Sequence, residues 1–208
     1  MNKRLDEVFI MIIWINGTFG AGKTTTAYEL HKRLPHSTVY DPERFGYALM
    51  ANIPKEVSKS DFQDYPLWRE ANYQLLKQIS EEHQGIIIVP MTLTNERYFA
   101  EIIGRLRSEG NEVKHFTLSA TKETVQKRLA KRLEGKSSWA YQQAEERITR
   151  LSKGFLREHI QTDGLSIDEV VERIAAQADL NLPPDYRTKF RKIIDRFLVQ
   201  MKEISFLK

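Results

Sequence analysis

The feature that most restricts the fold of this chain is a glycine-rich segment, INGTFGAGKTTT at residues 15–26, at the end of the apolar run VFIMIIWI. Residues 17–24 fit the pattern GxxxxGK followed by Ser or Thr at every fixed position. The apolar run is short enough to be one buried strand, and Ala27, Leu30 and Leu34 then recur at helical spacing. A strand, a glycine loop and a helix in this order predict a phosphate-binding loop rather than a turn that merely opens a helix.

The chemistry of such a loop assigns roles to its residues. Backbone N–H groups of a glycine loop converge on phosphate oxygens, and the N-terminus of the following helix adds positive potential. We expect Lys23 to reach the β- and γ-phosphates of ATP and the Thr24 hydroxyl to bind Mg²⁺. The residues expected to bind the nucleotide are Gly17, Thr18, Phe19, Gly20, Ala21, Gly22, Lys23, Thr24 and Thr25.

After this segment, short apolar runs alternate with helical patterns. Further strands are predicted at residues 37–40, 85–90, 112–118 and 158–162, and helical patterns separate them. Repeated strand–helix units predict a doubly wound α/β sheet. Ligands of such sheets bind outside the carboxyl ends of the strands, so the residues just after each strand are the candidates for function.

Composition limits the alternatives. With 208 residues, 41% of them hydrophobic and 29% charged, we expect a soluble globular chain with one sizeable core. There is no cysteine, which excludes disulfides and thiolate metal sites, and the five histidines show no ligand spacing. No apolar run in the sequence approaches the roughly 20 residues that a transmembrane helix requires.

Asp41 directly follows the second predicted strand and, with a proline after it, suits the N-cap of a helix. The same carboxylate would lie at the mouth of the sheet, where it could accept a proton from an attacking hydroxyl, with Arg44 as an anion-binding neighbour. After the third strand, where many P-loop proteins have an aspartate, the sequence offers only Thr92 and Thr94. We therefore expect Thr24, the phosphates and water to hold Mg²⁺, with help from Asp41.

Two further segments have both a structural and a functional interpretation. Arg128 and Arg132 lie four apart on one face of a predicted helix, either as solvated surface or as cations of a mobile lid over transferring phosphates. The segment DFQDYPLWREANYQLL contains Tyr65, Trp68 and Arg69. It is either an ordinary amphipathic helix with its preceding loop, or the wall of an acceptor pocket whose ring faces cover an apolar or nucleoside group.

The C-terminal residues differ in charge from the rest of the chain. Residues 187–208 hold seven basic and two acidic side chains, which leaves the remainder at net −1. We expect residues 1–182 to form the P-loop domain and 183–208 a basic amphipathic helix, packed on that domain or lying on an anionic membrane surface. Because the body is not basic, a nucleic-acid partner is not expected. The expected apolar stripe consists of Phe190, Ile194, Phe197, Met201 and Ile204, widened by Ile193 and Leu198.

Several longer segments point to a family. MIIWINGTFGAGKT, VYDPERFGYAL, DFQDYPLWR, IIIVPMT, EIIGRLRSEG, HFTLSATKET and HIQTDGLSIDEV together resemble the bacterial tunicamycin resistance proteins, from Met11 nearly to the C-terminus. Residues 1–10 lie outside the resemblance, so Met1 and Met11 both stay candidates for the native start. The resemblance implies a P-loop small-molecule kinase of the nucleoside-monophosphate-kinase type with a five-stranded parallel sheet. It also implies ATP binding, drug binding and peripheral attachment to the inner face of the cell membrane from the cytoplasm.

Tunicamycin is a uridine nucleoside that carries sugars and a fatty acyl chain, so a kinase-like pocket suits it. The leading hypothesis is ATP-dependent phosphorylation of such a drug, with residues 17–24 holding ATP, Asp41 as base, and Arg128 and Arg132 stabilising charge. The alternative is a protein that captures the drug in an ATP-dependent way and transfers nothing. The residues expected to bind the substrate are Asp41, Arg44, Tyr65, Trp68 and Arg69.

Overall fold

The computed structural model describes residues 10–131, 149–151, 154–156 and 158–206. Their core is a parallel sheet of five strands in the order β2-β3-β1-β4-β5, which confirms the predicted α/β fold. The phosphate-loop strand β1 is central, and β2 and β5 form the edges. The strands are β1 (Met11–Gly17), β2 (Ser37–Val39), β3 (Ile86–Pro90), β4 (Val113–Ser119) and β5 (His159–Gln161).

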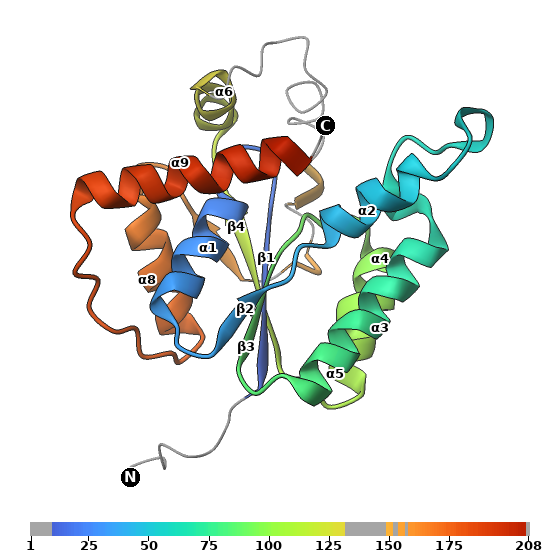
Figure 1. Cartoon of the computed structure of the whole chain (residues 1–208), viewed down its shortest axis with the longest axis horizontal. Helices are drawn as coiled ribbons and strands as arrows, with labels where there is room; N and C mark the ends of the chain where they lie inside the picture. Colours follow the sequence, from blue (N-terminus) through green and yellow to red (C-terminus); the bar gives the residue numbers. More distant parts are fainter. Residues whose placement is uncertain (1–9, 132–148, 152–153, 157, 207–208) are drawn as a thin grey trace.

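Helices cover both faces of the sheet. Figure 1 shows α1, α8 and α9 on one face and α3, α4 and α5 on the other, with α2 and α6 at the end where the strands finish. The predicted helix after β3 is a continuous run of α4, the π-helical turn η3 and α5. The helices are α1 (Lys23–Arg33), α2 (Pro42–Ala51), α3 (Pro66–Glu82), α4 (Glu96–Phe99), η3 (Ala100–Gly104), α5 (Arg105–Ser108), α6 (Lys122–Lys131), α8 (Ile167–Gln177) and α9 (Lys189–Phe206), with 3₁₀ turns η1 (Lys55–Val57) and η2 (Phe62–Asp64).

The central strand explains why the N-terminal apolar run has no polar face. Every residue of β1 is buried, because helices cover both sides of the sheet. Ile13 and Ile15 belong to the core beneath α1 and α8, whereas Ile12 and Trp14 belong to the core beneath α3 and η3. The core thus has two layers, and β1 separates them.

The C-terminal helix α9 is attached to the body by charged side chains. Glu29, on α1, is 1% exposed and pairs with Arg187 at 2.7 Å and Arg196 at 3.4 Å. Asp185 and Lys192 pair with each other at 3.0 Å in the same cluster. Because these basic groups face the body, the apolar stripe faces outward. Its exposed members are Phe190, Ile193, Phe197, Leu198 and Met201.

An acidic cluster lies where α1, α8 and the segment before α9 meet. Carboxylate oxygens of Glu29, Asp168 and Asp185 lie within 4.8 Å of one another, but the guanidinium and ammonium groups of Arg187, Lys192 and Arg196 pair with them. The acidic group is therefore part of the ion-pair cluster. Within the described ranges, no helix has the length and apolar character needed to cross a bilayer.

Candidate active site

The predicted phosphate-binding loop joins β1 to α1. Gly22 is the N-cap of α1 with a φ of 97°, a left-handed conformation that favours glycine, and it gives the helix no side-chain cap. A Cβ added to Gly17 would lie 2.8 Å from the carbonyl oxygen of Leu118, so glycine is required where the loop leaves the sheet. The uncapped N-terminus of α1 suits an anion such as a phosphate.

Lys23 has its ammonium group inside this loop. The residue is only 8% exposed, and its Nζ donates to the Thr18 carbonyl oxygen at 3.2 Å and lies 5.8 Å from the centroid of the Phe19 ring. A phosphate oxygen would be a stronger, charge-assisted acceptor for the same ammonium group. Thr24 is partly exposed in the first turn of α1, whereas Thr25 is buried. These residues fit the phosphates of a nucleotide, and the expected role of the Thr24 hydroxyl as a ligand for Mg²⁺ stays a prediction.

Two buried side chains, Asn16 and Thr92, fix the loop to the segment after β3. Thr92 Oγ1 donates to the Gly17 carbonyl oxygen at 2.6 Å. Asn16 Oδ1 accepts from the N–H groups of Gly17 at 2.8 Å and Leu93 at 3.0 Å, and Asn16 Nδ2 donates to the Leu93 carbonyl at 2.8 Å. Both backbone polar groups of Gly17 are therefore bound by side chains. Asn16 is not among the residues predicted from the sequence, where its only signal is a polar side chain directly after the apolar run.

His115, on β4, supports the same arrangement. Its Nε2 lies 3.2 Å from Asn16 Nδ2, and its ring packs edge-on against Phe99 with the centroids 5.0 Å apart. Burial, with smaller contributions from Arg107 and His159, lowers the pKa of His115 to about 3. The imidazole is therefore neutral at pH 7 and can accept a hydrogen bond from the Asn16 amide.

Asp41 begins α2 at the carboxyl end of β2, and its predicted capping role is confirmed. Its Oδ1 accepts the N–H of Glu43 at 3.0 Å, and Pro42 is the first helical residue. The Asp41 side chain is only 6% exposed, and its Oδ2 lies 3.8 Å from Arg44 Nε. Arg44 also donates to the Tyr28 hydroxyl of α1 at 3.0 Å, which joins α2 to the P-loop helix. The predicted function of Asp41 as a base stays a prediction.

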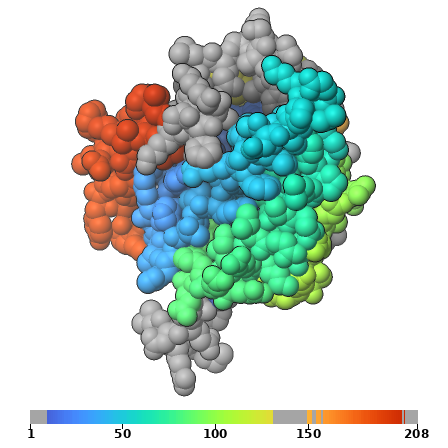
Figure 2. Space-filling model, turned by 45° about the vertical axis from the view of Figure 1, so that its right-hand side comes forward, coloured from blue at the N-terminus to red at the C-terminus, as the bar shows by residue number. Residues whose placement is uncertain are grey.

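A pocket of about 270 Å³ opens between the P-loop and α2. The P-loop contributes Phe19, the segment after β3 contributes Met91, and α2 contributes Glu43, Tyr47 and Met50. Figure 2 shows the cyan surface of α2 and the following loop beside the blue surface of α1. The remaining lining residues are Ser60, Asp61, Phe62 and Gln63. An acceptor in this pocket would lie next to the phosphate-binding loop.

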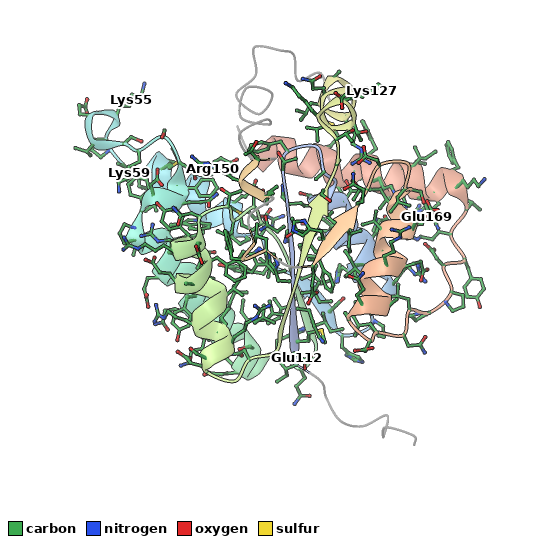
Figure 3. All side chains as sticks on the ribbon, turned by 180° about the vertical axis from the view of Figure 1, so that it is seen from behind. Lys55, Lys59, Glu112, Lys127, Arg150 and Glu169 are labelled. Atoms are coloured by element: carbon green, nitrogen blue, oxygen red, sulfur yellow. The ribbon has the colours of Figure 1, made fainter. Side chains whose placement is uncertain are left out.

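Three residues expected to bind the substrate make contacts outside the lining of this pocket. Trp68 is fully buried, and its indole N–H donates to the Pro42 carbonyl oxygen at 3.1 Å. Arg69 is 3% exposed and pairs with Glu101. Tyr65 accepts the N–H of Lys59 at 2.6 Å, and Figure 3 shows Lys59 on the loop that extends away from the body. None of the three is part of the described lining, so their contact with substrate stays a prediction.

Arg128, on α6, connects the P-loop with the end of β5. Its guanidinium donates to the hydroxyl and carbonyl oxygens of Thr162 at 3.0 and 2.9 Å, and it lies 3.5 Å from the Ala21 carbonyl oxygen. Lys127, the preceding residue, is exposed on the same helix (Figure 3). The structure thus brings Arg128 to the phosphate-binding loop, whereas Arg132 lies outside the described residues.

Comparisons with known proteins agree with this geometry. Residues 12–138 match the model of the AAA domain family. The solved tunicamycin resistance protein of Deinococcus radiodurans is 37% identical, with 85% of this chain and 100% of that chain covered and a TM-score of 0.73. The comparison with curated protein sequences gave no match.

Two solved kinases are similar at lower identity. A sugar kinase from Janibacter sp. HTCC2649 is 16% identical, with 83% of this chain and 96% of that chain covered and a TM-score of 0.61. The Mycobacterium tuberculosis APS kinase in complex with AMPPNP and APS is also 16% identical, with 81% and 97% covered and a TM-score of 0.53. At these identities the likeness concerns the fold alone.

Proposed function

Because this chain belongs to the AAA domain family and to the tunicamycin resistance proteins, we propose that it phosphorylates tunicamycin-like nucleoside antibiotics with ATP and thereby confers resistance. The observation that carries the proposal is the pocket beside the phosphate-binding loop, which leaves room for an acceptor next to the phosphates. A protein that uses ATP alone has less need for such a pocket.

The nucleotide half of the reaction rests on the loop at residues 17–24. Its N–H groups and the N-terminus of α1 hold the phosphates, and the Lys23 ammonium binds the β- and γ-phosphate oxygens. The Thr24 hydroxyl and the phosphates would hold Mg²⁺, which would neutralise part of the phosphate charge. Arg128, which already contacts the P-loop at Ala21, would stabilise the charge that develops on the transferring group.

The acceptor half requires a hydroxyl in the pocket and a group that takes its proton. The hydroxyl oxygen forms a bond to the γ-phosphorus, the bond between that phosphorus and the β–γ bridging oxygen breaks, and ADP leaves. The proton passes to the Asp41 carboxylate. Arg44, 3.8 Å from that carboxylate, keeps it oriented.

The direct test is incubation of the protein with ATP, Mg²⁺ and tunicamycin, followed by mass spectrometry of the drug. We expect a product heavier by one phosphate and a stoichiometric amount of ADP. Lys23→Ala should abolish both the product and resistance in cells while the protein stays folded, because the lysine mainly serves to bind phosphate. Unchanged drug, bound one to one, would favour ATP-dependent capture without transfer.

Asp41→Asn separates the two functions. Asn caps a helix about as well as Asp, so the free energy of unfolding should change little. If Asp41 is the base, turnover should fall by roughly 10² or more. Resistance that survives this substitution would remove Asp41 from the mechanism.

We also propose that the protein works in the cytoplasm, attached through α9 to the inner face of the cell membrane. The five exposed apolar side chains of this helix support interfacial burial, and Lys189 and Arg191 lie exposed on the same helix for contact with anionic lipid. Arg187, Lys192 and Arg196 pair with acids of the body. The electrostatic attraction to anionic lipid is therefore weaker than it would be if all seven basic residues of the C-terminal segment contacted lipid.

Liposome flotation tests this attachment. The intact chain should float with anionic vesicles and less with neutral ones, and Phe190→Ser combined with Phe197→Ser should stay in solution. Leu67→Ser is the matched control, because Leu67 is an exposed apolar residue on α3 at 60% exposure. Equal flotation of the double variant and the control would exclude the apolar stripe as the attachment site.

A further inference from the structure

Arg69, on α3, contacts the loop that forms one side of the pocket. Its guanidinium donates from Nη1 to the carbonyl oxygen of Gln63 and from Nε to one carboxylate oxygen of Glu101, on η3. The other oxygen of Glu101 accepts from Arg97 at 2.6 Å. The guanidinium carbon of Arg69 also lies 4.2 Å from the centroid of the Tyr98 ring. Only 3% of Arg69 is exposed, so these contacts compensate for the removal of a cation from water.

The loop at residues 59–65 is shaped by hydrogen bonds between its own residues. The N–H of Gln63 donates to Asp61 Oδ1 at 2.9 Å, and the N–H of Lys59 donates to the Tyr65 hydroxyl at 2.6 Å. Such bonds fix the form of the loop but do not place it on the body. Gln63 is buried and belongs to the pocket lining, so the bond from α3 to its carbonyl oxygen ends at the lining itself.

A second ion pair joins the same two helical segments at a distance from the pocket. Figure 1 shows α3 beside α4 and α5. Glu70, the residue after Arg69, pairs with Arg105 of α5, and the Arg105 guanidinium also lies 3.6 Å from the centroid of the Tyr73 ring. The side chains of this pair are 41% and 48% exposed, and neither residue is part of the described lining. The two pairs therefore differ in burial and in whether one partner reaches the pocket.

We propose that Arg69 is a positioning residue for the acceptor. The pair that it forms with Glu101 fixes the pocket wall, formed by α2 and residues 60–63, and the wall determines how the acceptor lies relative to the phosphates. The proposal rests on the proposed function and adds a residue that acts through the Gln63 carbonyl, without contact with the acceptor. Transfer is sensitive to such placement, because a shift of about 1 Å at the reacting atoms can cost about 10² in rate.

The geometry requires an arginine at this position. A guanidinium presents its N–H donors in a fixed fork, so Nε and Nη1 of Arg69 bind a carboxylate and a backbone carbonyl at the same time. A lysine ammonium is a point charge at the end of a flexible stem. We therefore expect Arg69→Lys to keep the pairing with Glu101 and the fold, but to hold the Gln63 carbonyl less well.

Hydrogen exchange tests the role of Arg69 without any ligand. Arg69→Met removes the donors and keeps an unbranched side chain, so the amides of residues 59–65 should exchange at least about tenfold faster than in the native chain. Arg105→Met removes the exposed pair, is the matched control, and should leave these amides unchanged. Arg69→Lys should give a smaller increase than Arg69→Met. If Arg69→Met and Arg105→Met change these amides equally, the proposal is wrong.

A double variant separates positioning from stability. Arg69→Met combined with Glu101→Met replaces the ion pair by apolar side chains, which should restore the urea midpoint of unfolding toward the native value. It does not restore the bond to Gln63, so the amides of residues 59–65 should still exchange fast. Slow exchange of these amides in the double variant would show that the pair serves stability alone and would overturn the proposal.

Calorimetry with tunicamycin and with AMPPNP measures the effect on the two halves of the site. The double variant should bind tunicamycin at least about tenfold more weakly in the presence of AMPPNP and Mg²⁺, and should bind AMPPNP as the native chain does. Arg105→Met should leave both affinities unchanged. Glu101→Ala keeps Arg69 but removes its carboxylate, so it should also weaken tunicamycin. Native affinity in Glu101→Ala would mean that Arg69 contacts the drug itself, which would exclude a positioning role.

Failure of this proposal is distinguishable from failure of the proposed function. Exchange of the loop needs neither drug nor turnover, and phosphate transfer is read from the mass of the drug. Weaker tunicamycin binding by the double variant, with no phosphorylated drug from the native chain, would retain the role of Arg69 and exclude the kinase. A phosphorylated drug with unchanged affinity and unchanged exchange in the double variant would do the reverse.

Discussion

The close packing of Phe62 on Gly46 leads to a testable prediction about the pocket wall, which is formed by α2 and residues 60–63. Gly46 is buried in α2, and a Cβ added there would lie 2.5 to 2.7 Å from three atoms of the Phe62 ring. Carbon atoms in contact prefer about 3.5–4.0 Å, so the ring would have to move by about 1 Å. Such overpacking costs about 1–3 kcal/mol, and the better helix propensity of alanine offsets about 1 kcal/mol of this. Gly46→Ala should therefore lower the free energy of unfolding by up to about 2 kcal/mol.

The chain offers a matched control at Gly104, a second helical glycine. A Cβ there would lie 3.6 Å from the nearest atom, the Ala100 Cβ, which is an ordinary contact distance. Gly104→Ala should therefore raise the free energy of unfolding by about 0.5–1 kcal/mol. Equilibrium urea unfolding measures both, and Gly46→Ala should also weaken tunicamycin binding, because Phe62 lines the pocket.

A double-mutant cycle isolates the contact. Phe62→Leu removes the ring, so adding Gly46→Ala to Phe62→Leu should cost less than adding it to the native chain. If the two glycine variants change stability in the same direction and tunicamycin binds both equally, the Phe62 ring does not lie on α2 and this account of the wall is wrong.

Three further predictions concern the supports of the site. Thr92→Val leaves the Gly17 carbonyl without its donor, so it should lower the free energy of unfolding by about 1–3 kcal/mol and weaken AMPPNP binding. Thr92→Ser keeps the hydroxyl and should leave both unchanged, as urea unfolding and binding calorimetry would show. Because the pKa of His115 is lowered to about 3, below its unfolded value, its contribution to stability is complete above pH 6.5 and is lost as the pH falls toward 3. The loss should reach about 2 kcal/mol at pH 5 and be absent in His115→Gln, as urea unfolding at several pH values would show. Arg187→Ala removes one partner of the buried Glu29 carboxylate and should cost about 1–2 kcal/mol, which Glu29→Gln should partly restore; no change in urea unfolding would contradict the pairing.

The phosphate-binding loop and the sheet could be predicted because their signals are local. The glycine pattern specifies a backbone shape within eight residues, and the apolar run before it specifies a central strand. The supports of the loop could not be predicted in the same way. Asn16 and Thr92 are 76 positions apart, and the contacts of Thr92 with Gly17 and of Asn16 with Leu93 exist only because β1 and β3 are neighbours in the sheet.

The C-terminal helix shows a second limit of sequence reasoning. Its periodicity predicted both the helix and the apolar stripe, but not the face that packs on the body. Charge counting treated the basic residues as available for lipid, whereas Glu29 on α1 and Asp168 on α8 bind Arg187 and Arg196. Because these acids are far from the basic residues in the sequence, they become partners only after α9 packs against α1 and α8. The outward orientation of the stripe thus follows from tertiary contacts.

The parallel topology explains why the positions of residues after the strands could be predicted from the sequence, whereas the position of the pocket wall could not. Each strand of a parallel sheet finishes at the same edge, so the residue after each strand is placed by the topology alone. The loop after β1, Asp41 after β2, Thr92 after β3 and Thr162 after β5 are all at that edge. The pocket wall, in contrast, is formed by a helix and a loop that leave the sheet, and the Phe62 ring of the loop packs on Gly46 of the helix. No periodicity marks that contact. Trp68 and Arg69 are not part of the described lining, and their contact with substrate stays a prediction.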